Sequence, residues 1–165
     1  MQDNEASMEN SIPPVSHYLT DFGVPHTVFQ HPGPVNTLEQ AAAERGQEPE
    51  QVVRSILFRL AKGEYAMVLM AGPSQISWRA LRAYLGQSRL STAKREEVLQ
   101  VTGYELGAVS PFGIPTSMRV LVDQSVLEQE EVSIGSGVRG TTVILRTADM
   151  MEVLDRAEVG HFANE

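Results

Sequence analysis

Apolar residues recur with two different periods along this chain, and the periods predict a mixture of strands and helices. Residues 53–60 and 65–70 are rich in strand formers and are separated by Lys62-Gly63, which predicts a β-hairpin. Further strands are expected at 26–30, around Val109, and at 118–122, 131–134 and 141–145. The hairpin indicates that at least part of the sheet is antiparallel.

Helices are predicted between these strands by apolar spacing and by capping residues. Ser77 is placed to cap a helix that runs through Leu85, and Thr37 with Gln40 three residues later forms a capping box. Further helices are expected at 15–22, 49–52, 91–101 and 147–154. The irregular spacing of helices and strands predicts one α/β (α+β) domain with a mixed, curved sheet rather than a doubly wound parallel sheet.

The chain of 165 residues is long enough for one hydrophobic core, and no linker or internal repeat divides it. We expect a flexible N-terminal tail at 1–12, the domain at 13–158 and a C-terminal tail at 159–165. No apolar run approaches the roughly 20 residues that span a bilayer, and the acidic start differs from a secretory signal. These features predict a cytoplasmic protein with no membrane partner.

The absence of cysteine excludes disulfides and thiolate chemistry, and no histidine spacing fits a metal site. A formal net charge of -8 argues against bulk attraction to nucleic acid. Five basic residues nevertheless crowd one stretch, namely Arg79, Arg82, Arg89, Lys94 and Arg95. Such a cluster is either a local nucleic-acid contact or an ordinary solvated surface.

Two glycine-rich segments interrupt the periodic pattern and predict shaped loops. Residues 102–115, TGYELGAVSPFGIP, are too irregular for a helix interior, and Gly113 permits close approach of another molecule. Residues 135–140, GSGVRG, follow a predicted strand. We expect the two loops to wall a pocket whose chemistry is mainly that of backbone N–H groups. Ser110 either donates a hydrogen bond to a ligand there or stabilises the turn.

Side-chain chemistry looks sparse, because the chain has no nucleophile elbow and no obvious pair of carboxylates. His31, in an HPGP turn, lines a pocket mouth or serves the turn. Asp123 follows a predicted strand and either orients a base or, as we predict, caps the next turn. Arg54 lies inside VVRSILF, where a charge is costly unless it is paired or borders a cleft. It is either an edge arginine with a packed stem or a guanidinium fork aimed at a phosphate or carboxylate.

These residues carry a resemblance to a known family. The chain resembles the YbaK/prolyl-tRNA synthetase-associated domain family of free-standing aminoacyl-tRNA deacylases over residues 13–158. The resemblance rests on His31-Pro32, on VVRSILF at 52–58, on TGY-x-x-G-x-x-SPFG at 102–113 and on GSGVRG at 135–140. It implies a mixed-sheet, barrel-like α/β domain without a metal or cofactor. It also implies hydrolysis of the ester between a wrong amino acid and the 3′ adenosine of a tRNA, typically proline tRNA carrying cysteine or alanine.

The resemblance also implies roles for particular residues. Arg54 would anchor the tRNA 3′ end, and Gly113 would supply a backbone wall that stabilises charge on the ester oxygen. The pocket would be shaped by His31, Ser55, Ser110, Gly135 and Ser136. The family pattern normally carries a lysine at the position of Arg54; arginine keeps the charge and can hold phosphate through two hydrogen bonds.

Three functions stay open on the sequence alone. The first is a trans-editing deacylase acting on the 3′ end of mischarged tRNA, free or docked on an aminoacyl-tRNA synthetase. The second is a module that binds an aminoacyl-tRNA or nucleotide end without cleaving it. The third is a hydrolase for another small ester or amide.

Overall fold

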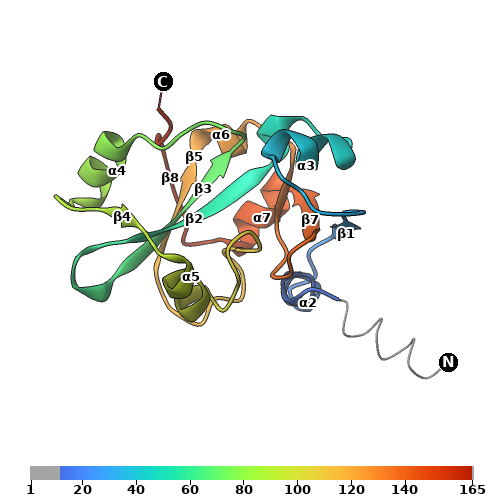
Figure 1. The fold of residues 1–165 in the computed structure, drawn as a ribbon, viewed down its shortest axis with the longest axis horizontal. Coiled ribbons are helices and arrows are strands. Elements are labelled where there is room, and N and C mark those ends of the chain that lie inside the picture. Colours follow the sequence, from blue (N-terminus) through green and yellow to red (C-terminus); the bar gives the residue numbers. More distant parts are fainter. Residues whose placement is uncertain (1–11, 165) are drawn as a thin grey trace.

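The computed structural model describes residues 12–164 and shows two β-sheets with short helices around them (Figure 1). The helices are α2 (Pro14–Asp21), α3 (Leu38–Glu44), α4 (Trp78–Leu85), α5 (Arg95–Thr102), α6 (Gln124–Leu127) and α7 (Thr147–Val153), with 3-10 turns η1 (Pro49–Gln51) and η2 (Ala61–Gly63). The strands are β1 (His26–Gln30), β2 (Val53–Arg59), β3 (Tyr65–Ala71), β4 (Ser91–Thr92), β5 (Arg119–Asp123), β6 (Glu131–Gly135), β7 (Thr141–Arg146) and β8 (Glu158–Gly160).

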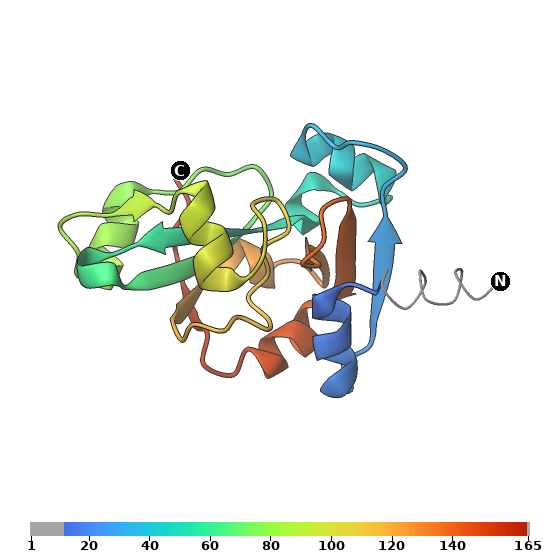
Figure 2. The ribbon, with the colours of Figure 1, turned by 60° about the horizontal axis from the view of Figure 1, so that its bottom comes forward.

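The strands form a three-stranded sheet in the order β1-β7-β6 and a five-stranded sheet in the order β4-β2-β3-β5-β8. The smaller sheet is antiparallel, whereas the larger one is mixed, because β5 runs parallel to both β3 and β8. Both views place α4 and β1 at opposite ends of the molecule (Figures 1 and 2). The prediction of a mixed α+β domain is therefore confirmed.

The barrel-like closure expected from the resemblance is wrong. The larger sheet ends at β4 and β8, and the smaller one ends at β1 and β6. Within residues 12–164, the two sheets are joined by a single isolated parallel bridge between Val52 and Ser133. A barrel requires continuous hydrogen bonding around a closed ring of strands, and one bridge does not provide it.

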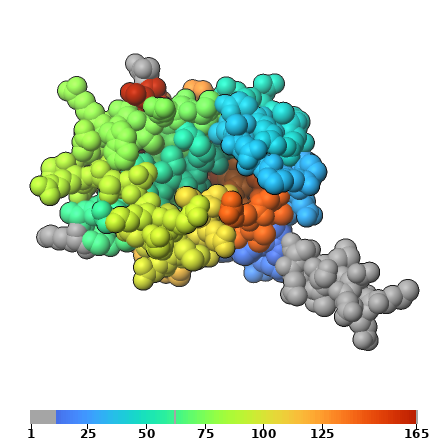
Figure 3. Space-filling model, in the orientation of Figure 1, coloured from blue at the N-terminus to red at the C-terminus, as the bar shows by residue number. Residues whose placement is uncertain are grey.

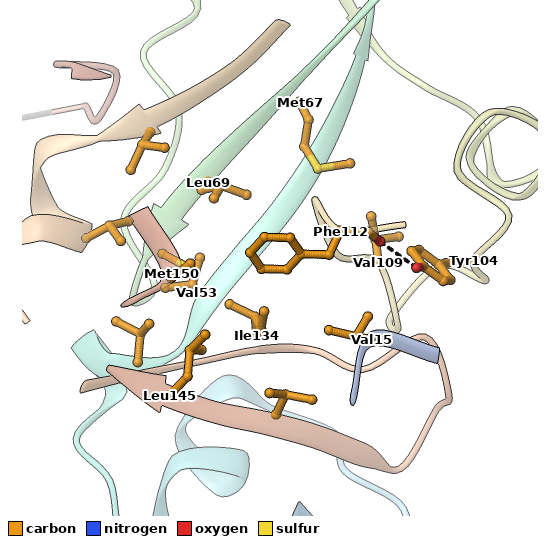
Figure 4. Packing of buried hydrophobic residues seen from close by; sticks show 14 of the residues in the cluster. Val15, Val53, Met67, Leu69, Tyr104, Val109, Phe112, Ile134, Leu145 and Met150 are labelled. Atoms are coloured by element: carbon orange, nitrogen blue, oxygen red, sulfur yellow. Dashed lines mark hydrogen bonds between the residues drawn. The ribbon is translucent and has the colours of Figure 1, made fainter. Parts of the chain in front are cut away.

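Hydrophobic side chains fill both faces of the five-stranded sheet. The larger cluster lies between the two sheets and includes Val53, Met67, Leu69, Ile134 and Leu145 (Figure 4). The smaller cluster lies under α4 and includes Phe58, Val68, Met70, Leu81, Leu85 and Phe162. Residues 66–71 of β3 are all buried, which explains why this strand reads as a continuous apolar run.

Most predicted elements are confirmed, including the β2–β3 hairpin and the Ser77 cap, whose hydroxyl accepts a hydrogen bond from Ala80 N–H. Two predictions are wrong. Ser91 and Thr92 do not start a helix but pair with the end of β2, and the helix begins at Arg95. Val109 lies in a loop rather than a strand. In both places tertiary partners override local propensity.

Asp123 joins the C-terminal segment to the sheet. Its carboxylate caps α6 by accepting from Ser125 N–H (3.0 Å), as predicted, and also accepts from Phe162 N–H (2.7 Å). Burial raises the pKa of Asp123, but hydrogen bonds from Ser125 and Phe162 outweigh it and hold the pKa below its usual value. The residues just after 158, expected as a tail, thus contribute β8 and a buried Phe162. The expected N-terminal tail lies, except for Ile12, outside the described residues.

Candidate functional site

A cleft of about 1600 Å³ opens on one face of the molecule (Figure 3). One side is α3 with the turn before it, and the other side is formed by the loops at 104–113 and 135–140. Arg54 and Ser55 of β2 and Ser133 of β6 also line it. The cleft therefore sits where the two sheets meet.

The two glycine-rich loops pack backbone against backbone, and we call them together the glycine wall (residues 104–113 and 135–140). A Cβ on Gly135 would lie 2.0 Å from the carbonyl oxygen of Val109, so no side chain fits there. Gly137 N–H also donates to the carbonyl of Ala108 (2.9 Å). Gly107, Val109 and Gly135 line the cleft, as expected for a wall made largely of main chain.

Gly113, expected to supply a backbone wall of the pocket, lies outside the cleft lining. It is exposed and adopts a φ of +73° beside Tyr104. The Tyr104 hydroxyl donates to the carbonyl of Phe112, as the dashed line in Figure 4 shows. The φ and the tight contact with Tyr104 require glycine, whereas Gly107 and Val109 are the residues of this loop nearest to Gly113 in sequence that line the cleft.

Ser110 and Ser136 are also absent from the cleft lining, and both are fully buried. Ser110 Oγ accepts from Phe112 N–H (3.1 Å), and Ser136 Oγ accepts from Val138 N–H (3.1 Å). Their hydroxyls stabilise the turns of the glycine wall. For Ser110, the structure favours the turn reading over direct contact with a ligand.

Several main-chain donors of the glycine wall that line the cleft have no partner among the described residues, namely those of Leu106, Gly107, Val109, Arg139 and Gly140. Ala108 N–H, in contrast, donates to the carbonyl of Glu105 (2.9 Å). Gly107 is exposed, so water can accept from its N–H, whereas the unpaired N–H of the buried Val109 is costly unless a ligand oxygen or water accepts from it.

Arg54 lines the cleft with its guanidinium held by main-chain oxygens. Nε donates to the carbonyl of Gly72 (2.8 Å), and Nη2 donates to that of Ser74. These acceptors are neutral, and no ion pair among the described residues includes Arg54. Burial lowers the pKa of the guanidinium, but arginine stays charged. The side chain therefore offers a fixed positive charge with N–H donors to spare.

His31 is bound through both ring nitrogens. Nδ1 lies 2.7 Å from Glu44 Oε1, and Arg45 Nη1 lies 3.1 Å from Nε2. Arg45 can only donate, so Nε2 accepts and the proton sits on Nδ1. The hydrogen bond from His31, with one from Gln40, lowers the pKa of Glu44. His31 lines the cleft as expected, but its nitrogens are occupied, which makes it a positioning group for Arg45 rather than a base.

Ser55 and Ser133 present two buried hydroxyls that have no hydrogen-bond partner in the part of the chain described. Both line the cleft, and Ser133 is only 1% exposed. Most buried hydroxyls are satisfied, so two unsatisfied ones beside one cleft are candidate groups for contact with a ligand or a bound water. The sequence pointed to Ser55 but not to Ser133, whose period-two position in β6 was the available signal.

Ser16 of α2 forms another contact that the sequence reading missed. Its Oγ lies 2.7 Å from His26 Nε2, and His26 Nδ1 lies 2.8 Å from the carbonyl of Val24. The carbonyl fixes the proton on Nδ1, so the hydroxyl donates to Nε2. Ser16 lines the cleft, and this hydroxyl–imidazole pair also ties α2 to β1.

The charge of the cleft is opposite to that of the chain. Three arginines line it, Arg45, Arg54 and Arg139, together with His17 and His31. None of the 21 aspartate and glutamate residues is among its described lining residues. Positive charge focused in a cleft attracts anions even when the net charge of the protein is -8.

No three histidine or acidic side chains within residues 12–164 gather closely enough to hold a metal ion. None of the helices found there has both the length and the apolar character needed to cross a bilayer.

Comparison with known proteins gives a consistent set of matches. The model of the "Aminoacyl-tRNA editing domain" family matches residues 32–153. Proline--tRNA ligases of Thermosipho melanesiensis and Kosmotoga olearia are each 30% identical, over 105 and 113 residues, or 64% and 68% of this chain. The chain spans only 18% and 19% of those two ligases. A crystal structure described as a candidate trans-editing enzyme for prolyl-tRNA synthetase superposes with a TM-score of 0.83 at 25% identity, covering 92% of this chain and 95% of that one.

Proposed function

The chain belongs to the aminoacyl-tRNA editing domain family, and on this basis we propose that it is a trans-acting deacylase of mischarged tRNA. The observation that carries the proposal is the cleft lined by three arginines and by no described carboxylate. The 3′ end of a tRNA is a polyanion, and this cleft is the region of an acidic protein suited to receive it. The substrates proposed are proline tRNAs that carry cysteine or alanine.

Arg54 is the proposed anchor for a phosphate near the 3′ adenosine. Its guanidinium is already oriented by Gly72 and Ser74, so little side-chain freedom is lost when phosphate binds. Its unused N–H groups can form charge-assisted hydrogen bonds, which are stronger than neutral ones. In this proposal arginine takes the place of the lysine that the family pattern carries.

The glycine wall is the proposed site of charge stabilisation. Water adds to the ester carbonyl, negative charge builds on the carbonyl oxygen, and the bond to the ribose oxygen breaks as that oxygen takes a proton. The N–H groups of Gly107 and Val109, two of the unpaired main-chain donors in the cleft lining, are proposed to stabilise the developing charge. We assign this role to them in place of Gly113, which lies outside the lining.

The hydroxyls of Ser55 and Ser133 are proposed to bind the aminoacyl group. A polar atom of the substrate would satisfy two groups that the free protein leaves unpaired. Discrimination against the cognate amino acid would come from the size and shape of the pocket. A ribose hydroxyl, or the thiol of a cysteinyl group, would assist the attack, since no side-chain nucleophile is required.

The test is multiple-turnover deacylation of proline tRNA charged with cysteine, alanine or proline, by the natural protein and by Arg54→Ala and Arg54→Lys. We expect turnover of a wrong ester, a loss of roughly 100-fold in kcat/KM for Arg54→Ala, and partial recovery in Arg54→Lys. Arg146→Ala, which removes an exposed arginine outside the cleft, is the matched control and should keep full activity.

Other results would change the assignment. Binding of charged tRNA without turnover would make the protein a binding module. Turnover that ignores competing uncharged tRNA would indicate a hydrolase of small esters. Full turnover by Arg54→Ala would remove Arg54 from the mechanism.

A further inference from the structure

Acidic and basic residues are distributed unevenly along this chain, and one basic segment lies outside the lining of the cleft. Residues 65–95 contain no aspartate or glutamate, although the chain has 21 of them. The same 31 residues hold five of the 13 basic residues. We call these five the cation face: Arg79, Arg82, Arg89, Lys94 and Arg95. An even distribution of charge would have put several carboxylates in a stretch of this length.

The fold leaves the cation face turned to solvent. In α4, Leu81 and Leu85 are buried against the sheet, while Arg79 is exposed and Arg82 is half-buried. Arg79 and Arg82 are three residues apart on one helix and therefore neighbours of like charge, an unfavourable arrangement without a partner. Arg89, Lys94 and Arg95 are also exposed.

Two carboxylates near the cation face are committed to other groups, whereas the exposed Glu96 beside Arg95 forms no ion pair among the described residues. Glu158 accepts from Arg119 Nε (2.9 Å) and from the Tyr84 hydroxyl (2.9 Å). Glu97 accepts from the Tyr65 hydroxyl (2.8 Å) and pairs with Arg59 (3.7 Å). The ion pairs found in residues 12–164 are these two, and neither they nor the hydrogen-bonded contact between His31 and Glu44 include a member of the cation face.

The cation face is continuous with the cleft. Arg54 in the cleft binds the carbonyls of Gly72 and Ser74, and this loop leads through the cap Ser77 into α4. Figure 3 shows residues 72–95, green to yellow-green, on the same face as the hollow. A molecule whose end enters the cleft can therefore lie along α4 and the segment after it.

We propose that the cation face binds the phosphate backbone of the RNA duplex that adjoins the 3′ end held in the cleft. The proposed occupant is a duplex because its phosphates are regularly spaced and can be bound whatever the base sequence. Dispersed basic side chains, with no neighbouring groups arranged to contact base edges, suit such an array. The inference rests on the proposed function only for the identity of that RNA.

The test measures binding of an uncharged RNA hairpin with a 3′ CCA end, by fluorescence anisotropy across a salt series. The variant is Arg79→Ala/Arg89→Ala, and the charge-matched control is Arg146→Ala/Arg156→Ala, which removes two exposed arginines outside the cation face. Two lost phosphate contacts should reduce the slope of log K against log salt by about 1.8 and weaken binding roughly 10- to 100-fold at 0.1 M salt. The control should bind like the natural protein.

A single-stranded CCA oligonucleotide separates this inference from the proposed function. It lacks the duplex, so its binding should be unchanged in Arg79→Ala/Arg89→Ala and reduced in Arg54→Ala. Equal salt slopes for the variant and the control, or no binding of the hairpin by the natural protein, would overturn the cation face. If Arg79→Ala/Arg89→Ala loses hairpin binding and the natural protein does not deacylate charged tRNA, the role of the cation face is supported and the proposed enzymatic activity is refuted.

Discussion

The two sides of the cleft are built on different principles. The glycine wall is main chain packed on main chain, so its geometry is fixed by what cannot be added at Gly135. On the other side, Arg54 and Arg45 are side chains held by the hydrogen bonds that they donate to a carbonyl and to His31. Substitutions in the glycine wall should therefore impair the protein by changing the shape of the cleft. Substitutions on the arginine side should impair it by removing positive charge.

The largest effect is expected where the shape is broken. Gly135→Ala places a methyl group on the carbonyl of Val109, so the loops must separate. We expect a loss of about 3 kcal/mol in the free energy of unfolding and loss of deacylation. Urea unfolding checks it, with Gly33→Ala as the control, because Gly33 lines the cleft with nothing within 4 Å of its added Cβ. Equal stability of the two variants would contradict the packing described.

Removal of a buried, unpaired hydroxyl is expected to raise the stability of the fold and to lower activity. Ser133→Ala removes an unpaired hydroxyl, so the free protein should become more stable by about 1 kcal/mol while kcat/KM falls. Ser136→Ala is the matched control, since that hydroxyl is fully bonded and its loss should destabilise the fold by a similar amount. Thermal unfolding together with deacylation measures both. A destabilised Ser133→Ala protein with full activity would show that the hydroxyl serves the fold.

At Ser16 an effect on stability alone is expected. Ser16→Ala removes its hydrogen bond to His26, which should cost about 1 kcal/mol of stability. Turnover should persist, because the proposed chemistry depends on main-chain donors and on the substrate. Initial rates at constant folded fraction check this, with His26→Ala as a second variant. Complete loss of turnover in both, with the fold intact, would instead make Ser16 and His26 a nucleophile–base pair.

The smallest effect concerns acid pH on the arginine side. The hydrogen bond from His31 lowers the pKa of Glu44 in the folded state. The stability that Glu44 contributes is therefore present above the pKa of an unfolded glutamate and is lost as pH falls through the lower, folded value. Titration of the Glu44 carboxyl carbon by NMR measures this pKa, and His31→Ala should return it toward the ordinary value. An unchanged pKa in that variant would assign the shift to Gln40.

Periodicity was a reliable guide wherever an element is held by its own sequence. The β2–β3 hairpin and the helix capped at Ser77 depend on local alternation and capping, and both form as predicted. β4 and β8 were missed because each is two or three residues long and exists only through its neighbour in the sheet. The roles expected for Gly113 and Ser110 had the same limit, since a motif does not reveal which of its atoms face a cleft.

The sequence by itself determined the mixed α+β class, the family and the proximity of two glycine-rich loops to a pocket, because local periods and fixed motifs encode them. Only the tertiary structure decided that the sheets stay open, that Gly107 and Val109 rather than Gly113 reach the cleft, and that Ser133 joins Ser55. It also decided that an acidic chain presents a cleft whose described lining has no carboxylate. Such properties depend on contacts between residues far apart in the chain, where local propensity carries no information.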